Sequence, residues 1–279
     1  MSNPFSGNGG GERDRIPVRQ VCTVLYDELP ALDARITEAR LKQLVGPCSV
    51  EWSTIGQAEP PISGGIAEFG EHRVAMVALN APVREEVLAL TVGVSPMPEE
   101  TRRRLMGHGA AIRLLYIGEA DDPVEQLTGL YAVAGVLLLQ SGLAIINERA
   151  ALAQPADLAF NYLPQLGNEV PPISLWVGVV TYGMGEGAAP GSQFLMRTYG
   201  MDQMSLPELS MYMSDRTMAD DVYHTIINTC LYLVQGRPSL ELGVGHRVEF
   251  RGHAYLLSDP GRTGPEFASE TGMLLLVEV

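Results

Sequence analysis

The chain has 279 residues, 46% of them hydrophobic, and a formal net charge of −14 at pH 7. This length is enough to bury a substantial core as one large domain or two small ones. The acidic balance argues against nucleic-acid binding, because that affinity comes largely from Lys and Arg neutralising phosphates. Lysine occurs once, at Lys42. We therefore expect no nucleic-acid partner.

The three cysteines, Cys22, Cys48 and Cys230, are far apart and form no Cys-x-x-Cys pair. Because no secretory leader is recognisable, we expect reduced thiols and a cytoplasmic protein. The longest apolar stretch, Val133 to Leu139, is much shorter than the roughly 20 residues that cross a bilayer. We therefore expect no membrane span.

Residues 1–15 are rich in Gly, Ser and Asn, which predicts a disordered tail. An N-terminal lobe over 16–107 then begins with the β-branched run Val21–Tyr26, which predicts a buried strand. Hydrophobic spacing and breaker residues predict the rest of this lobe: a helix over 31–45, a strand over 49–55, one or two strands within 66–79 that turn at Gly70-Glu71, and helices over 83–90 and 99–106.

The C-terminal lobe over 108–279 contains the sharpest local signal of the chain. After an apolar strand over 110–117 come Asp122, Pro123, Val124 and Glu125, which place Asp at the N-cap, Pro at N1 and Glu at N3 of a helix. This helix extends to about Gln140 and is apolar nearly all round, so we expect it to be buried on more than one side.

The remaining elements are shorter or interrupted by proline and glycine. They are a strand over 143–147, a proline-broken stretch to Pro172, a strand over 173–182, a glycine-rich loop over 183–191, paired strands over 194–199 and 208–213, a helix over 217–235, and terminal strands over 248–250, 254–257 and 273–279.

The two lobes share a weak internal sequence similarity. Val24-Leu25-Tyr26 and Leu114-Leu115-Tyr116 each lead through an acidic loop into a helix and then a strand, as in ferredoxin-like units. The prediction is an α+β fold with two lobes of mostly antiparallel sheet, each with helices packed on one face. The two lobes either are separate domains or form one continuous domain.

Complete catalytic and cofactor motifs are absent from the sequence. Neither a P-loop nor a Gly-x-Ser-x-Gly elbow occurs, and the glycines after Gly183 do not lead into a helix start, so we expect no nucleotide cofactor. The histidines form no His-x-x-x-His pair, so we expect no metal site.

Five polar residues lie at or beside the ends of predicted strands and are the candidates for a binding or catalytic site: His108, Glu148, Arg197, Tyr199 and Glu208. A general acid or base among them would need a neighbour that shifts its pKa. For Arg197 and Glu208 a cross-strand ion pair is the structural alternative. For His108 it is an interaction with the dipole at a helix C-terminus.

Six methionines, at 196, 201, 204, 211, 213 and 218, gather within a short stretch. Methionine fills irregular cores and also lines adaptable binding surfaces. We interpret the cluster as core or dimer-interface filling in preference to a binding groove. Together with the apolar helix from Pro123, it suggests a self-assembling structural subunit as one possible function.

Several motifs of the second half resemble one bacterial family in the same order. They are His108-Gly-Ala-Ala, Asp122-Pro123, Gly142-Leu-Ala-Ile, Leu175-Trp176-Val177, Thr198-Tyr199-Gly200-Met201, Pro207-Glu208-Leu209 and Tyr232-Leu233-Val234. The set is similar to the domain of unknown function 4261 family over about residues 105–250. The chain departs from the family pattern at Met204-Ser205, where the family has Phe-Gly, and at Ser210, where it has an acid. The resemblance implies no activity.

Three functions remain open from the sequence. The acidic balance and the lack of catalytic signatures favour a non-enzymatic binding protein that neutralises a basic protein partner, as an immunity-type protein does to a toxin. An enzyme with an unfamiliar site around Arg197, Tyr199 and Glu208 is the second function, and self-association is the third.

Overall fold

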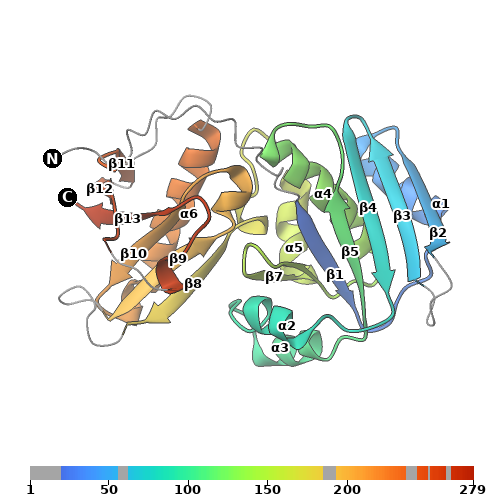
Figure 1. Cartoon of the computed structure of the whole chain (residues 1–279), viewed down its shortest axis with the longest axis horizontal. Helices are drawn as coiled ribbons and strands as arrows, with labels where there is room; N and C mark the ends of the chain where they lie inside the picture. Colours follow the sequence, from blue (N-terminus) through green and yellow to red (C-terminus); the bar gives the residue numbers. More distant parts are fainter. Residues whose placement is uncertain (1–19, 56–61, 185–192, 237–243, 251, 262–264) are drawn as a thin grey trace.

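The computed structural model describes residues 20–55, 62–184, 193–236, 244–250, 252–261 and 265–279 (Figure 1). They form two sheets that lie side by side, with six α-helices packed against them. The predicted α+β class is confirmed. The predicted tail over 1–15 and most of the glycine-rich loop lie outside the described residues. No helix among the described residues is long and apolar enough to cross a membrane.

The first sheet is fully antiparallel, in the order β2-β3-β4-β5-β1-β6-β7. The turn between β3 and β4 falls at Gly70 and Glu71, as the sequence predicts. The strands are β1 (Val21–Tyr26), β2 (Ser49–Ile55), β3 (Ile62–Phe69), β4 (His72–Leu79), β5 (Ala110–Tyr116), β6 (Ala144–Asn147) and β7 (Leu152–Pro155).

Helices cover both faces of this sheet, because side chains alternate along each strand. From β1, Val24 and Tyr26 belong to the main core with α4 (Pro123–Leu138), and α1 (Ala34–Val45) packs against α4 on this same side. Leu25 points to the opposite face, where it meets α2 (Glu85–Thr91) and α3 (Glu99–Met106) through Leu88 and Leu105. The predicted one-face arrangement thus holds for α1 and α4 but not for α2 and α3.

The predicted helix cap at Asp122 is present. The Asp122 carboxylate accepts a hydrogen bond from the Val124 amide at 2.9 Å, and Pro123 occupies the first turn. The helix that follows is buried over most of its length, from Leu127 to Leu138. It connects β5 to β6, which are parallel with β1 between them, so β5–α4–β6 is a split unit of the ferredoxin type. The other predicted unit, β1–α1–β2, does not have this arrangement, because three strands separate β1 from β2 in the sheet.

The second sheet is mixed, in the order β11-β12-β13-β10-β9-β8, with β10 and β13 parallel. Helix α6 (Ala219–Gly236) packs against β9 and β10, and the short α5 (Ala156–Tyr162) lies near β6 and β7. The strands are β8 (Gly178–Gly183), β9 (Phe194–Tyr199), β10 (Glu208–Met213), β11 (Arg247–Phe250), β12 (His253–Ser258) and β13 (Met273–Glu278).

Two sequence predictions differ from this arrangement. The strand predicted over 173–182 begins only at Gly178, because Pro171 and Pro172 start a 3-10 turn over Ile173–Leu175. The lobe boundary predicted at 107/108 falls inside the first sheet, between α3 and β5. The change of sheet comes after β7, because β5 pairs with β1 and β6 pairs with both β1 and β7.

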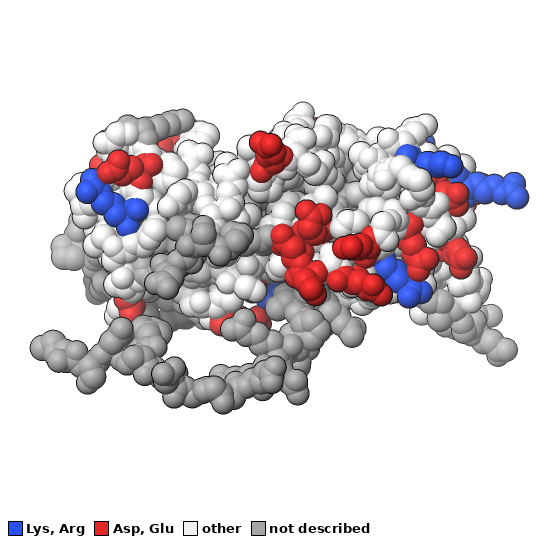
Figure 2. Space-filling view, turned by 90° about the horizontal axis from the view of Figure 1, so that it is seen from above, with Lys and Arg blue, Asp and Glu red and all other residues white. Residues whose placement is uncertain are grey.

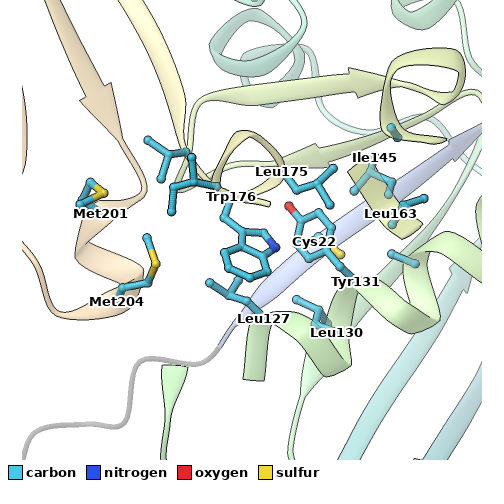
Figure 3. Close-up of a cluster of buried hydrophobic side chains, with 14 of the residues drawn as sticks. Cys22, Leu127, Leu130, Tyr131, Ile145, Leu163, Leu175, Trp176, Met201 and Met204 are labelled. Carbon is cyan, nitrogen blue, oxygen red and sulfur yellow. The ribbon is translucent and has the colours of Figure 1, made fainter. Parts of the chain in front are cut away.

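One hydrophobic core continues from the first sheet into the second (Figure 3). Trp176 is fully buried between them, and its ring meets the ring of Tyr131 from α4 edge-on at 6.5 Å. Met201 and Met204 approach from the second lobe. Of the six clustered methionines, all but Met218 are buried, so the core-filling interpretation is confirmed for those five.

A polar network lies beside this shared core. The Gln203 side chain accepts a hydrogen bond from Asn147 at 3.1 Å and donates to the Trp176 carbonyl at 3.3 Å. Asn147 also donates to the Tyr131 hydroxyl at 3.3 Å. Because these residues come from α4, β6 and the segments around β8 and β9, the network ties the two lobes together in the same place as the apolar core.

Candidate functional site

His108 is a buried structural histidine. Its Nε2 accepts a hydrogen bond from the Val83 amide at 2.9 Å, and its Nδ1 lies 2.8 Å from the Leu105 carbonyl, to which it donates. These two bonds require the neutral ring. Burial lowers the pKa of His108, while the bond to Leu105 opposes that shift. The ring therefore joins the loop before α2 to the end of α3 and has both nitrogens occupied.

Glu148 lies just after β6, and its ion-pair partner is none of the other four candidates. Its carboxylate is 3.4 Å from the Arg113 guanidinium of β5, and both side chains are partly exposed. They border a hollow of about 200 Å³ on the face of the first sheet that lies opposite α4.

Arg197, Tyr199 and Glu208 lie together on the β9–β10 hairpin, but the predicted Arg197–Glu208 ion pair is absent from the described contacts. The Arg197 guanidinium lies 4.0 Å from the centre of the Tyr199 ring. It donates to the carbonyls of Glu266 at 2.8 Å and Ala268 at 3.1 Å. These bonds hold the segment before β13, around residues 266–268, against the sheet. Arg197 is only 1% exposed, so we assign it a structural role.

Glu208 is buried and closes the turn between β9 and β10. Its carboxylate accepts hydrogen bonds from the Thr198 hydroxyl at 2.6 Å and from the Gly200 amide at 2.9 Å. Burial raises the pKa of Glu208, and the bond from Thr198 works against that shift. Tyr199 bonds through its hydroxyl to Tyr182. Each of these groups has a partner within the fold, and none lines a described cavity.

The largest described cavity, about 440 Å³, opens elsewhere, beside His72 at the start of β4. We call it the His72 pocket. Its floor is mostly apolar and its rim carries two carboxylates. The lining residues are Leu44, Val45, Phe69, Gly70, Glu71, His72, Ala120, Glu125, Thr128, Ala132, Leu166 and Gly167.

The His72 ring is held by three neighbours. Its Nδ1 lies 3.1 Å from the Tyr116 hydroxyl, and its ring packs against that of Phe69 at 5.0 Å between centroids. On the third side α4 carries Gly129, where an added Cβ would lie 2.5 Å from Nδ1. The glycine therefore lets the ring lie directly against the helix.

Carboxylates surround this ring. Burial lowers the pKa of His72, whereas the charges of Glu125 and Glu71 act to raise it. A second hollow next to the pocket shares Glu71 and His72 and adds Glu68, Glu119 and Arg73, of which Arg73 pairs with Glu68 at 2.8 Å. Figure 2 shows acidic side chains gathered on the upper surface of this lobe. The site is thus an apolar depression with a neutral histidine inside and negative charge around its mouth.

This arrangement suits a cationic group attached to an apolar stem. Carboxylates at the rim attract an ammonium or guanidinium, and the floor accepts methylene groups. The described residues contain no group of three or more His, Cys, Asp and Glu side chains that could hold a metal ion. The described lining of the pocket contains no cysteine or serine, and its one aliphatic hydroxyl belongs to Thr128.

The sequence did not single out this pocket. His72 was one of five histidines without a motif, and Glu125 was recognised only as part of the helix cap. The pocket forms because the β3–β4 turn meets α1, the first half of α4 and residues 166–167, which are remote in the chain. The Glu71-His72 pair at a predicted turn was the one local hint.

In comparisons with protein-family models, curated proteins and solved structures, no match was found. The resemblance of the second half to the domain of unknown function 4261 family therefore stays a prediction.

Proposed function

We propose that this chain is a non-enzymatic binding protein whose His72 pocket takes a basic side chain of a protein partner. The observation that carries the proposal is the pairing of a mostly apolar floor with the rim carboxylates of Glu71 and Glu125. A Lys or Arg stem matches the floor, and its charged head matches the rim. Such a protein would cover a basic surface, as an immunity-type protein covers a toxin.

The charge of the whole chain supports the same partner. At −14, the chain attracts a basic protein over long range and speeds the encounter at low salt. His72 adds a pH dependence, because its protonation would place a positive charge inside the pocket. Since burial lowers the pKa of His72 below its ordinary value of 6.5, this loss of affinity is expected only in acidic solution.

The first test is the binding of an oligoarginine peptide, measured by fluorescence anisotropy at two salt concentrations. We expect Glu71→Gln with Glu125→Gln to weaken binding about tenfold, because both carboxylates are exposed and each ion pair with the peptide contributes up to about 1 kcal/mol. Glu85→Gln with Glu86→Gln on α2 removes the same charge from an exposed site away from the pocket and serves as the matched control. Equal affinity for both double variants would refute the proposal.

The second test identifies the natural partner. Wild-type and Glu71→Gln/Glu125→Gln proteins are used as parallel baits in native extract, with the control variant beside them. We expect a stoichiometric basic protein on the wild type and on the control, but much less of it on the pocket variant. A partner set that is the same on all three baits would contradict a role for the pocket.

A further inference from the structure

Among the described residues, the His72 ring is hydrogen-bonded at only one of its two nitrogens. Its Nδ1 lies 3.1 Å from the Tyr116 hydroxyl, whereas Nε2 has no described partner. Nδ1, Cγ and Cβ all lie against the Gly129 position of α4, and Nε2 is at the far end of the ring from Cβ. The side chain is half-buried and lines both the His72 pocket and the hollow beside it. Nε2 is therefore the ring nitrogen that a ligand in the pocket can reach.

The Tyr116 hydroxyl has two acceptors within reach and a single hydrogen to donate. It lies 3.1 Å from His72 Nδ1 and 3.5 Å from the Glu71 carbonyl oxygen. Burial raises the pKa of Tyr116, although the hydrogen bond from the Ala120 backbone opposes that shift, so the hydroxyl keeps its proton at neutral pH. A Cβ on Gly118 would lie 2.6 Å from both the hydroxyl and the Glu71 carbonyl oxygen, so the glycine leaves this second direction open.

The direction of this hydroxyl determines which nitrogen of the neutral His72 ring carries the proton. When Tyr116 donates to Nδ1, the ring proton is on Nε2, which is then a donor. When Tyr116 donates to the Glu71 carbonyl, Nδ1–H donates to the Tyr116 oxygen and Nε2 is an acceptor. That carbonyl is bonded in both states, because it also accepts from the Glu119 amide at 3.1 Å. The shorter distance, to Nδ1, favours the donor form in the unliganded protein.

We infer that a bound cation reverses this arrangement and that His72 Nε2 accepts one of its N–H groups. The inference rests on the proposed binding of a basic side chain in this pocket. An ammonium or guanidinium beside the rim carboxylates of Glu71 and Glu125 directs N–H groups at its surroundings, and a ring with its proton on Nε2 would oppose it. With the proton on Nδ1, the same ring offers the cation a neutral acceptor next to the two carboxylates.

This acceptor narrows the class of ligand that the pocket takes. A primary ammonium and a guanidinium each carry several N–H donors, so either can bond to a rim carboxylate and to Nε2 together. A trimethylated lysine has the same charge and a larger apolar head but no N–H to donate. We therefore expect the pocket to take Lys or Arg and to discriminate against quaternary ammonium groups. Tyr116 is a positioning residue, because it acts on the ligand only through the His72 ring.

The first measurement compares a short lysine peptide with the same peptide carrying trimethyllysine, by fluorescence anisotropy at pH 8. We expect the wild type to bind the lysine peptide about tenfold more tightly, as for one hydrogen bond to a charged group. His72→Phe keeps a ring without an acceptor, so it should bind both peptides equally. Tyr116→Phe removes the partner of Nδ1–H and should also lose the preference, because buried N–H groups without partners are rare. His224→Phe, at an exposed position on α6 (Ala219–Gly236), is the matched control and should keep it.

The second measurement identifies the protonated nitrogen directly, by long-range proton–nitrogen NMR of the full chain with isotope-labelled histidine at pH 8. The signals that disappear in His72→Phe belong to this ring. We expect the proton on Nε2 in the free protein and on Nδ1 with saturating lysine peptide. A proton found on the same nitrogen with and without peptide would overturn the inference. So would a preference for lysine that persists in His72→Phe, because the size of the methyl groups would then explain it.

These outcomes are distinguishable from failure of the proposed function. If Glu71→Gln/Glu125→Gln binds the lysine peptide as tightly as the wild type does, or if the wild type does not bind it, the proposed function is wrong and this inference with it. If the double variant loses binding while the His72 proton stays on one nitrogen, the pocket still binds cations and only the role of Nε2 is wrong. Circular dichroism of each variant confirms that the fold is kept.

Discussion

His108 provides the sharpest test of the structural roles assigned here, through the substitution His108→Phe. Phenylalanine keeps a ring of similar size but cannot bond to either the Val83 amide or the Leu105 carbonyl. The Val83 amide would lose its acceptor, at a cost of about 1–3 kcal/mol. The Leu105 carbonyl keeps a bond from the His108 amide at 3.3 Å, so its loss is smaller. We therefore expect the free energy of unfolding at pH 8 to fall by about 2–3 kcal/mol.

The pH dependence distinguishes this role from simple packing. Because burial lowers the pKa of His108, the folded protein binds this proton less readily than the unfolded chain does. The stabilisation is complete above the ordinary pKa of 6.5 and is lost as the pH falls below it. Wild type should therefore lose up to about 1.4 kcal/mol per pH unit more than His108→Phe in this range.

Urea unfolding from pH 8 to pH 5, followed by tryptophan fluorescence and circular dichroism, measures both quantities. The two unfolding free energies should converge as the pH falls. His72, whose pKa is also lowered by burial, contributes equally to both proteins and cancels in the difference. Parallel pH profiles, or a variant as stable as wild type at pH 8, would refute the assigned hydrogen bonds.

Three further substitutions test α4 and the junction of the lobes. Gly129→Ala should destabilise the protein by at least about 1 kcal/mol, despite the better helix propensity of alanine, because the new Cβ meets the His72 ring. Gly135→Ala is the control on the same helix and should cost little, because its new Cβ meets only the flexible Leu163 side chain. Asp122→Ala should cost about 1 kcal/mol through loss of the helix cap, measured by thermal unfolding. Asn147→Ala and Gln203→Ala should show a coupling energy of about 0.5–3 kcal/mol in a double-mutant cycle, and strictly additive effects would contradict their hydrogen bond.

Local signals in the sequence placed most elements correctly. The cap residues at Asp122 and Pro123 fixed the start of α4 because capping depends only on neighbours along the chain. The buried nature of this helix also followed from its apolar residues. The elements after Asn147 were harder to predict. The short strand β7 and helix α5 lie within a proline-broken stretch, and their stability comes from packing against the rest of the lobe.

Contacts remote in sequence could not be predicted in the same way. The strand β5 was assigned to the second lobe, yet it pairs with β1 and β4 of the first, because register depends on which apolar faces meet in three dimensions. The ion pair considered for Arg197 and Glu208 is missing from the described contacts for the same reason. Arg197 and Glu208 were rightly placed on one hairpin, but their side chains bond to a distant carbonyl segment and to the turn, and not to each other.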